Sequence, residues 1–434
     1  MKMSKIALLL FIFVLGLRCW GADEKIDGLT LQDAIHIAIA QNLSLKAALA
    51  DVKIGEAQTT EANSGLLPNL SVSYSAIREL NPAGPTIQSS FGIFKSFPYL
   101  LNTYKDGVTL NQLIFDGAHT ESLVKQAHFR TESLEAQYRG LIHQITFNVS
   151  QGFYALIEAR RLVRVAEDSL KNAQVHLRLA EANYKAGIAA KADVTFAEVP
   201  VASATLDLTR AKETALTSEA TLDRTLSFDV NTKLELQDPS SYDEVIPSEK
   251  DAQVFALRDR EEIKSSKSQV EAARAQLGAA KGSAWPVISA FANYGYTDYM
   301  TNAIPGNLGW TVGGQITLSL FDGNLQSAQV HEGAATVEKN VALLDSAVQD
   351  VLLDVKQAYL RVTSAKQAVV EAEVEAEKAK TNVDTVSGQY KVGVVPILNL
   401  IDAETANTQA QTRVVTTELD YHTAFARLNL AMGR

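Results

Sequence analysis

Hydrophobic residues recur at every seventh position along two long stretches of the chain, and a second series lies three or four positions from the first. In the later stretch the first series runs from Val341 to Val383 and is mostly valine, whereas the second runs from Val337 to Val386 and is rich in alanine. Two such series form the a/d seam of packed helices, and alanine lets helix backbones approach closely. The pattern predicts two helices of about 70 residues, each on the order of 105 Å long, from near Gly117 to Ala186 and from near Gly323 to Val392.

Each long helix follows segments that alternate between apolar and polar residues, which is the pattern of strands. The clearest runs from Trp310 to Phe321, and its expected partner runs from Val287 to Tyr296. In the first half, Leu70 to Ala76 alternates with serines, and a weaker strand is expected from about Asp106 to Phe115. Strands of about ten residues can cross a bilayer, although a soluble sheet with one buried face uses the same alternation. Aromatic residues gather at the two ends of the predicted strands: Trp285, Phe115 and Phe321 at one, and Tyr296, Tyr299 and Trp310 at the other.

The two halves of the sequence repeat one another. Tyr184 to Ile188 returns as Tyr390 to Val394, a shift of 206 residues, and the Phe-Asp-Gly at Phe115 returns at Phe321 with the same shift. Upstream, Pro68 matches Pro286 at a shift of 218, so a loop between the proline and the Phe-Asp-Gly differs in length by twelve residues. A duplication this long predicts the same series of elements in each half.

Each repeat is expected to open with a helix, Thr30 to about Gly65 or about Asp251 to Lys281. After each long helix a glycine should end the helix in the left-handed conformation, and the chain should return as a second helix, Ala192 to Phe228 or Pro396 to Gly433. Pro200 is expected to kink its helix or delay its start. The predicted divisions are a signal segment at 1–21, a first repeat at 22–228, a connector at 229–250 and a second repeat at 251–434.

The first residues have the pattern of a secretory signal peptide. Met1 to Lys5 is basic, Ile6 to Leu17 is apolar, and small residues follow near Gly21. The apolar run is shorter than the about 20 residues of a membrane-spanning helix. Cys19 is the only cysteine, and Arg18 stands where a lipidated cysteine would require a small residue. Cleavage after Gly21 or Ala22 is therefore expected, and it would leave a chain without cysteine and without thiol chemistry.

Composition and motifs argue against several functions. A net charge of −10 makes nucleic acid an unfavourable partner. The seven histidines are scattered and are expected to be solvated, and the chain has no Gly-rich phosphate loop and no hydrolase nucleophile motif. The alternate glutamates from Glu371 to Glu377 step around a helix and are interpreted as a solvated face. The sequence therefore predicts no enzyme activity, no metal site and no cofactor.

Four strands form an open sheet, and each unpaired backbone group at an edge costs several kcal/mol in lipid. Copies of the chain are therefore expected to close a shared barrel. Two copies would contribute 8 strands around a filled interior, whereas three would contribute 12 and leave a lumen. The polar face suits a wet interior; its members are Ser71, Ser73, Ser75, Thr311, Gln315, Thr317 and Ser319.

The chain resembles the TolC-type outer-membrane efflux proteins. The resemblance lies in the order of elements after the signal peptide, which occurs twice: helix, strand, strand, very long helix, tip and returning helix. The resemblance covers essentially the whole mature chain, and its most specific points are Leu113 to Gly117, Leu320 to Gly323 and the two tips. It implies a mainly α fold with a membrane β-barrel portion: a homotrimer with four transmembrane strands per protomer, a 12-stranded barrel, and coiled-coil helices that cross the periplasm. It also implies a passive channel in the bacterial outer membrane, supplied by an inner-membrane transporter and a periplasmic adaptor protein, in tripartite efflux or type I secretion.

The same resemblance assigns roles to particular residues. The periplasmic gate aligns with Asp402, Asn399, Asp193 and Tyr390, although Asn399 replaces the aspartate usual there and Val395 replaces an arginine. Helix capping is an equally good role for Asp193 and Asn399. The tips that would contact the adaptor are Gly187, Ile188, Gly393 and Val394. The strand-to-helix junctions are Phe115, Asp116 and Gly117 in the first repeat and Phe321, Asp322 and Gly323 in the second.

Two other classes of protein share parts of this pattern. A periplasmic adaptor, or membrane fusion protein, also has a signal peptide and a long helical hairpin, but it has one hairpin inserted in lipoyl and barrel domains. A structural periplasmic coiled-coil protein would lack the strand pairs. The patterns do not distinguish a resistance-nodulation-division pump from an ABC transporter or a type I secretion system.

Overall fold

The computed structural model describes residues 26–81, 87–94, 98–229, 232–238, 245–298 and 306–434. The expected signal segment with Cys19, and also Tyr299, lie outside the described residues. The chain forms two compact units, and each contains parts of both sequence repeats. Unit 1 comprises Met1–Asn42, Ile145–Ile246 and Leu360–Arg427, and unit 2 comprises Leu43–Gln144, Pro247–Tyr359 and Leu428–Arg434.

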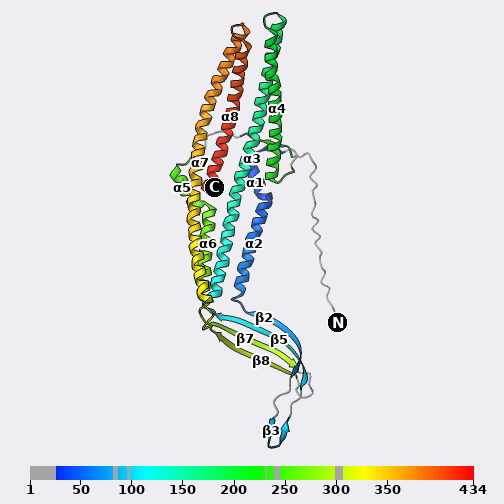
Figure 1. Ribbon diagram of the computed structural model, residues 1–434, viewed down its shortest axis with the longest axis vertical. Coiled ribbons are helices and arrows are strands. Elements are labelled where there is room, and N and C mark those ends of the chain that lie inside the picture. The colour runs from blue at the N-terminus through cyan, green and yellow to red at the C-terminus, as the bar shows by residue number, and fades with distance from the viewer. Residues whose placement is uncertain (1–25, 82–86, 95–97, 230–231, 239–244, 299–305) are drawn as a thin grey trace, which may run out of the picture. The chain divides into compact units, whose positions relative to one another are not determined.

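Two helices of 67 residues, α3 (His119–Lys185) and α7 (Leu325–Lys391), confirm the predicted long helices (Figure 1). From their ends the chain returns as α4 (Lys191–Leu226) and α8 (Ile397–Met432), each of 36 residues. The bounds of α3 and α7, and those of α4 and α8, differ by the 206 residues of the repeat. Pro200 lies inside α4, well after its first residue, so the expected delay of the helix start was wrong.

The predicted a/d seam is buried along the middle of α7. Val355 and Val362 of the valine row are fully buried, and Ala358 and Ala372 of the alanine row are nearly so. Closer to the start of the helix, Val341 is exposed in the single chain. The heptad pattern therefore identified a packing surface that one copy of the chain covers only in part.

The helix expected at the start of each repeat is interrupted, so the prediction of one continuous helix was wrong. The four helices are α1 (Leu31–Gln41), α2 (Leu43–Ser64), α5 (Glu249–Asp259) and α6 (Glu261–Gly282). At Asn42 and at Arg260 the ψ angle is 124°, which is extended and cannot continue a helix. The expected cap at Thr30 is confirmed, because its side-chain oxygen accepts a hydrogen bond from the Asp33 amide at 3.2 Å.

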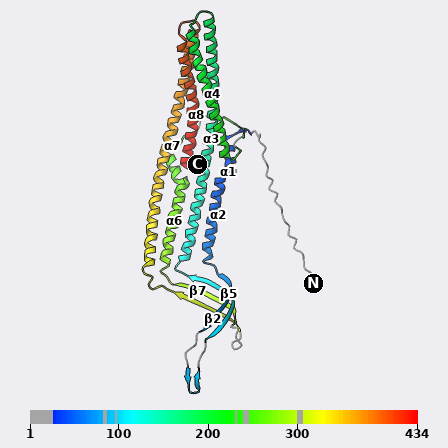
Figure 2. The ribbon, with the colours of Figure 1, turned by 45° about the vertical axis from the view of Figure 1, so that its right-hand side comes forward.

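Unit 2 contains one antiparallel sheet with the strand order β2-β5-β7-β8, labelled in Figure 1 and seen from another side in Figure 2. Its strands are β2 (Asn69–Asn81), β5 (Tyr99–Phe115), β7 (Val287–Asp298) and β8 (Asn307–Thr317). The strand expected to be weak, β5, is the longest with 17 residues and joins the two repeats through β7. Conversely, β8 ends at Thr317, so the expectation that it continues to Phe321 was wrong.

The strand register separates an apolar face from a polar one. Consecutive partners across the four strands are Val72, Val108, Tyr294 and Trp310 on one face, and Ser71, Thr109, Asn293 and Thr311 on the other. Directly opposed residues of antiparallel strands share a face, so the predicted alternation is confirmed for these two rows, whereas Asp106 opposite Tyr74 and Tyr296 lies on the otherwise apolar face. The apolar face is exposed in the single chain, with Val72 at 80% and Trp310 at 76% of full exposure.

Two small sheets complete the described strands. β3 (Ile87–Ser89) and β4 (Gly92–Phe94) form a hairpin in the loop where the twelve-residue difference was expected. In unit 1, β1 (Ile26–Leu29) pairs in parallel with β6 (Leu234–Leu236), which lies in the connector. None of the described helices is both long and apolar enough to cross a membrane.

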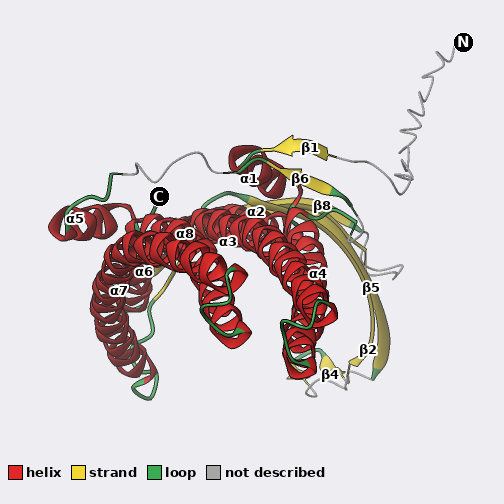
Figure 3. Cartoon of the chain, turned by 90° about the horizontal axis from the view of Figure 1, so that it is seen from above, coloured by secondary structure: helices red, strands yellow, loops and turns green. Residues whose placement is uncertain are grey.

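In unit 2, the helices α7, α6, α3 and α2 lie side by side in that order, and α5 lies outside this row (Figure 1 and Figure 3). α3 lies between α2 and α6: the Thr59 and Thr131 hydroxyls are 3.1 Å apart, and the Ser133 and Ser265 hydroxyls are 2.9 Å apart. α7 packs on the other side of α6, where the small residue Gly333 meets the α6 backbone.

Candidate functional site

Both helix tips end in the same backbone turn. Gly187 after α3 and Gly393 after α7 have φ angles of 73° and 76°, the left-handed region in which glycine is favoured. The amide of the next residue, Ile188 or Val394, donates to the carbonyl five residues earlier at 2.9 Å in each tip. This is the Schellman turn, and it leaves the Ile188 and Val394 side chains exposed. The predicted helix ends are confirmed, and contact with an adaptor stays a prediction.

The polar residues Asp402, Asn399 and Asp193, predicted for a gate, lie near these tips. Asp402 and Asn399 are exposed on α8, whereas Leu400 between them is fully buried. Asp193 accepts a hydrogen bond from the Ala190 amide at 3.3 Å and therefore caps the start of α4. The geometry thus gives Asp193 a capping contact and leaves Asp402 and Asn399 open to solvent.

Tyr390 is buried in an apolar cluster beneath the tips, together with Ala180, Ala197, Ile397 and Leu400. The Asn183 side chain approaches its buried hydroxyl without forming a hydrogen bond of regular geometry. Burial raises the pKa of Tyr390, while the Asn183 side chain opposes this shift and the Asp193 charge adds to it. Because the cluster draws on α3, α4, α7 and α8, Tyr390 joins the two hairpins of unit 1 chiefly by packing.

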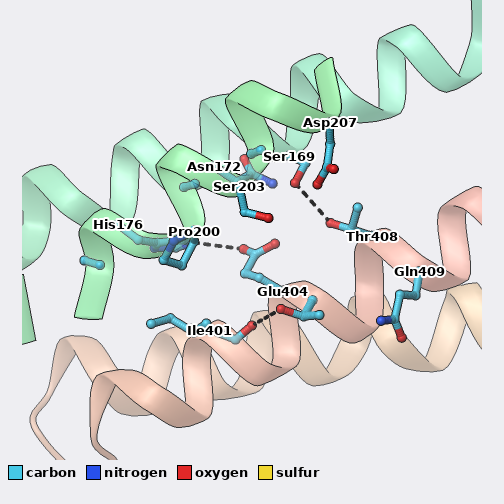
Figure 4. A pocket seen from close by; sticks show the side chains of 14 residues that line it. Ser169, Asn172, His176, Pro200, Ser203, Asp207, Ile401, Glu404, Thr408 and Gln409 are labelled. Atoms are coloured by element: carbon cyan, nitrogen blue, oxygen red, sulfur yellow. Dashed lines mark hydrogen bonds and ion pairs between the residues drawn. The ribbon is translucent and has the colours of Figure 1, made fainter. Parts of the chain in front are cut away.

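A cavity of about 240 Å³ lies between α3, α4 and α8 in unit 1 (Figure 4). On its wall, His176 Nε2 of α3 lies 2.9 Å from Glu404 Oε1 of α8, and both side chains are mostly buried. Asp207 of α4 lines the same cavity. The expectation that the histidines are solvated was therefore wrong for His176, whose side chain is mostly buried against Glu404. The spacing of residues around His176 could not show this contact, because Glu404 belongs to the other repeat.

Further contacts within unit 1 hold α3 against α8. Arg161 pairs with Glu418 at 2.8 Å, and the ring of Tyr154 stacks on His422 with 5.1 Å between centroids. Burial lowers the pKa of His422; the Glu418 charge opposes this shift and the Arg161 charge adds to it. His422 is thus a second histidine that is packed in the interior and not solvated.

The two Phe-Asp-Gly segments start the long helices. Asp116 and Asp322 each accept a hydrogen bond from the backbone amide four residues later, at 2.8 and 2.9 Å, and so cap α3 and α7. Phe115 is the last residue of β5, so the first segment is a direct strand-to-helix junction. Phe321 lies beyond the end of β8, so the second is not a direct junction in the single chain.

The glycines of these segments have different surroundings. Gly117 and Gly323 share a left-handed φ, of 67° and 70°. A Cβ atom at Gly117 would lie 2.5 Å from both the Gly282 carbonyl oxygen and the Trp285 Cβ, whereas one at Gly323 would meet nothing within 4 Å. The surface beside Gly323 is therefore open where its repeat counterpart is closely packed.

A buried carboxyl group near the end of α4 was not anticipated. Asp223 is fully buried, and neither carboxylate oxygen makes a regular hydrogen bond with the described residues. Burial raises the pKa of Asp223 to about 7; the charges of Glu219 and Asp229 add to the shift, and the Thr232 backbone opposes it. Glu219 is instead neutralised by Arg160 at 2.7 Å. A single aspartate in a polar helix gives no sequence signal of such burial.

The row of alternate glutamates on α7 lies on the surface of the helix. The glutamates from Glu371 to Glu377 are exposed, as expected, and Glu375 pairs with Arg413 of α8 at 2.8 Å. Within the part of the chain that the structure describes, no group of three or more His, Cys, Asp or Glu residues could hold a metal ion.

Comparison with known proteins places this geometry in a family. The sequence profile of the family described as "Outer membrane efflux protein" matches residues 34–227 and 255–434. The chain is 25% identical over 414 residues to "Outer membrane efflux protein BepC" of Brucella suis, covering 93% of this chain and 85% of that protein. It is 24% identical over 428 residues to "Alkaline protease secretion protein AprF" of Pseudomonas aeruginosa, covering 94% and 85%.

A solved structure shares the fold. The Campylobacter jejuni CmeC outer membrane channel superposes with a TM-score of 0.81 at 16% identity, covering 93% of this chain and 85% of that one. The family profile spans both repeats with their long helices, strands and tips. This chain therefore belongs to the outer membrane efflux protein family.

Proposed function

We propose that this chain is the outer-membrane channel of a tripartite efflux or type I secretion system. It would conduct substrates passively from an inner-membrane transporter and a periplasmic adaptor to the exterior. The sheet of unit 2 carries the proposal, because its register aligns an apolar row from Val72 to Trp310 on one face and a polar row from Ser71 to Thr311 on the other. An apolar outer face suits lipid, and a polar inner face suits water.

The edges of this sheet require further copies. β2 and β8 are the outer strands of the sheet and have one neighbour each among the described strands. Lipid offers no hydrogen bonds to an open edge, so identical chains would close the sheet into a ring. Three copies would give 12 strands and leave a lumen, which is the basis for proposing a homotrimer.

The helix tips suit the periplasmic end of the channel. Apolar side chains at Ile188, Val392 and Val394 are exposed there, which supports binding of an adaptor protein. Asp402 and Asn399 are exposed on the same hairpins, and three copies of Asp402 in a narrow pore would attract cations. The relatives include one named for efflux and one named for protease secretion, so both classes of pump remain within the proposal.

Membrane fractionation and planar-bilayer recording test this function together. The channel should be recovered from outer membranes as a detergent-extracted oligomer that dissociates on heating, and the purified oligomer should conduct ions. A periplasmic adaptor or a structural coiled-coil protein would give no such channel activity. Recovery of a non-conducting protein in the soluble periplasmic fraction would refute the proposal.

A further inference from the structure

In unit 2, a helix of the first repeat packs on a helix of the second repeat, and the equivalent contact between the repeat counterparts of these two helices is not formed within one chain. By the shifts of 206 and 218 residues, α7 is the counterpart of α3, and α2 is the counterpart of α6. α3 packs on α6 within the chain, through the Ser133 and Ser265 hydroxyls. The equivalent contact would join α7 to α2, whose corresponding faces are exposed.

The contact between α3 and α6 has a defined antiparallel register. Ser133 Oγ lies 2.9 Å from Ser265 Oγ and accepts a hydrogen bond from Gln269 Nε2 at 3.2 Å. One heptad earlier along α3, Gln126 Nε2 donates to Gln276 Oε1 at 3.1 Å. Polar groups buried between helices fix register, because sliding the helices would leave them unpaired.

Applying the repeat shifts transfers this register to the exposed faces. Ser133 corresponds to Lys339 on α7, and the two residues that flank it, Ser265 and Gln269, correspond to Ala47 and Asp51 on α2. Lys339, Ala47 and Asp51 are all exposed, and neither Lys339 nor Asp51 forms an ion pair with a described residue. The transfer therefore brings an unpaired cation to an unpaired anion.

We propose that α7 of one copy packs on α2 of the next copy in this register, with Lys339 lying against Ala47 and Asp51 of the neighbouring copy. The inference rests on the proposed oligomeric channel and specifies which residues meet at its subunit interface. Such a head-to-tail contact uses two different surfaces of each chain and closes into a ring.

The sheet gives the same register independently. Leu110 and Gln112 of β5 face Ala292 and Ala290 of β7. The repeat shifts convert these pairs into Ile316 facing Tyr74, and Leu318 facing Val72, between β8 and the β2 strand of the next copy; the intervening pair becomes Thr317 facing Ser73. Apolar residues then meet on the apolar face and polar residues on the polar face, whereas a slip of one residue would mix them.

This register also accounts for the early end of β8. Leu318 and the residues that follow it lie beyond the last pair with β7, which is Val287 with Thr317. Their remaining partner would be β2 of the neighbouring copy, so the strand should lengthen towards Phe321 on assembly. At the adjoining helix ends the contact must be wider than in the first repeat, because Ser64 replaces Gly282, whose approach to Gly117 leaves no room for a Cβ atom.

Disulfide cross-linking tests the register directly. In the full-length protein in outer membranes, Lys339→Cys combined with Ala47→Cys should form covalent dimers and trimers on mild oxidation, because their counterparts Ser133 and Ser265 have hydroxyls 2.9 Å apart. The matched control, Ser133→Cys with Ser265→Cys, should cross-link within one chain and give no ladder. Single-cysteine variants exclude pairing through Cys19.

A displaced pair measures specificity. Lys339→Cys with Gln58→Cys places the second thiol eleven residues from position 47, about 16 Å along α2, and should give no ladder. An equal ladder from the displaced pair, or none from Lys339→Cys with Ala47→Cys in an intact oligomer, would overturn the proposed register while leaving the channel proposal standing. Absence of any oligomer in the unmodified protein would refute both.

Charge exchange provides a second readout. Asp51→Lys places two cations together and should lower the temperature at which the oligomer dissociates, and adding Lys339→Asp should restore it. Asp51→Lys on its own could reduce stability for reasons unrelated to the interface, so the rescue is the decisive comparison. Failure of Lys339→Asp to rescue, with both single variants impaired, would argue against this pairing.

Discussion

Replacing Asp223 with asparagine should stabilise unit 1 at alkaline pH and have little effect in acid. The carboxyl group has an ordinary pKa of 3.8, and burial raises it to about 7 in the folded chain. Each unit of difference between the folded and unfolded pKa is worth about 1.4 kcal/mol, so ionised Asp223 destabilises the fold by at most roughly 4 kcal/mol. We expect about 2 kcal/mol, because the effective dielectric constant around buried charges in proteins is high enough to reduce such penalties.

The direction follows from proton linkage. A raised folded pKa means that the folded chain holds the proton more tightly, so the stability that this proton contributes is complete below about pH 4 and is lost as the pH rises to about 7. Asp223→Asn is neutral throughout and has a similar shape. The variant should therefore show no loss over this range, and its advantage should be greatest above about pH 7.

Hydrogen exchange of the Leu234 amide, which donates to Glu219 at 3.1 Å, reports local opening beside Asp223. At about pH 8, after correction for intrinsic rates, exchange should be roughly 30-fold slower in Asp223→Asn than in the unmodified protein, which corresponds to about 2 kcal/mol. Asp207→Asn, an exposed position on the same helix, is the control and should change exchange by less than about twofold, within about 0.5 kcal/mol. Faster exchange in Asp223→Asn, or corrected rates that do not vary with pH in the unmodified protein, would refute the reasoning.

Three further predictions concern packing, the junction and the tips. Ala358→Leu should overpack the buried a/d seam, cost about 1 to 3 kcal/mol of stability per copy and lower the melting temperature of the oligomer. The control Glu373→Gln, on an exposed face of α7, should cost no more than about 0.5 kcal/mol. Equal effects of the two substitutions would argue against a buried seam. Gly117→Ala should destabilise the fold by about 2 kcal/mol or more, measured by thermal melting, because a Cβ there meets Gly282 and Trp285 and the φ angle is left-handed. Asp402→Ala should lower cation over anion selectivity in planar bilayers and Asn399→Asp should raise it; unchanged selectivity in both would leave the gate elsewhere.

Local periodicity was sufficient to predict the repeating framework. The heptads identified α3 and α7, and the glycines at Gly187 and Gly393 marked their ends, because helix continuation and helix termination depend on residues within a few positions of one another. Alternation likewise identified the strands and their two faces, since the side-chain direction in a strand follows from sequence position alone.

The same local rules failed where a distant segment decides the outcome. β8 was expected to reach Phe321, but a strand continues only where a partner strand lies beside it, and in the single chain the last pair is at Thr317. The interruption at Arg260 occurs at a good helix former, so residue type gave no warning there, whereas asparagine at position 42 is a weaker helix former that favours helix ends.

The sequence by itself determined the duplication, the element order and the alternation of the sheet, because each is set by spacing along the chain. Only the tertiary structure decided which polar residues are buried. His176 meets Glu404, and Ser133 meets Ser265, across more than a hundred residues of sequence. Asp223 is enclosed without a regular hydrogen-bond partner among the described residues. Burial of a polar side chain depends on the surface that another segment brings to it, and periodicity does not encode the identity of that segment.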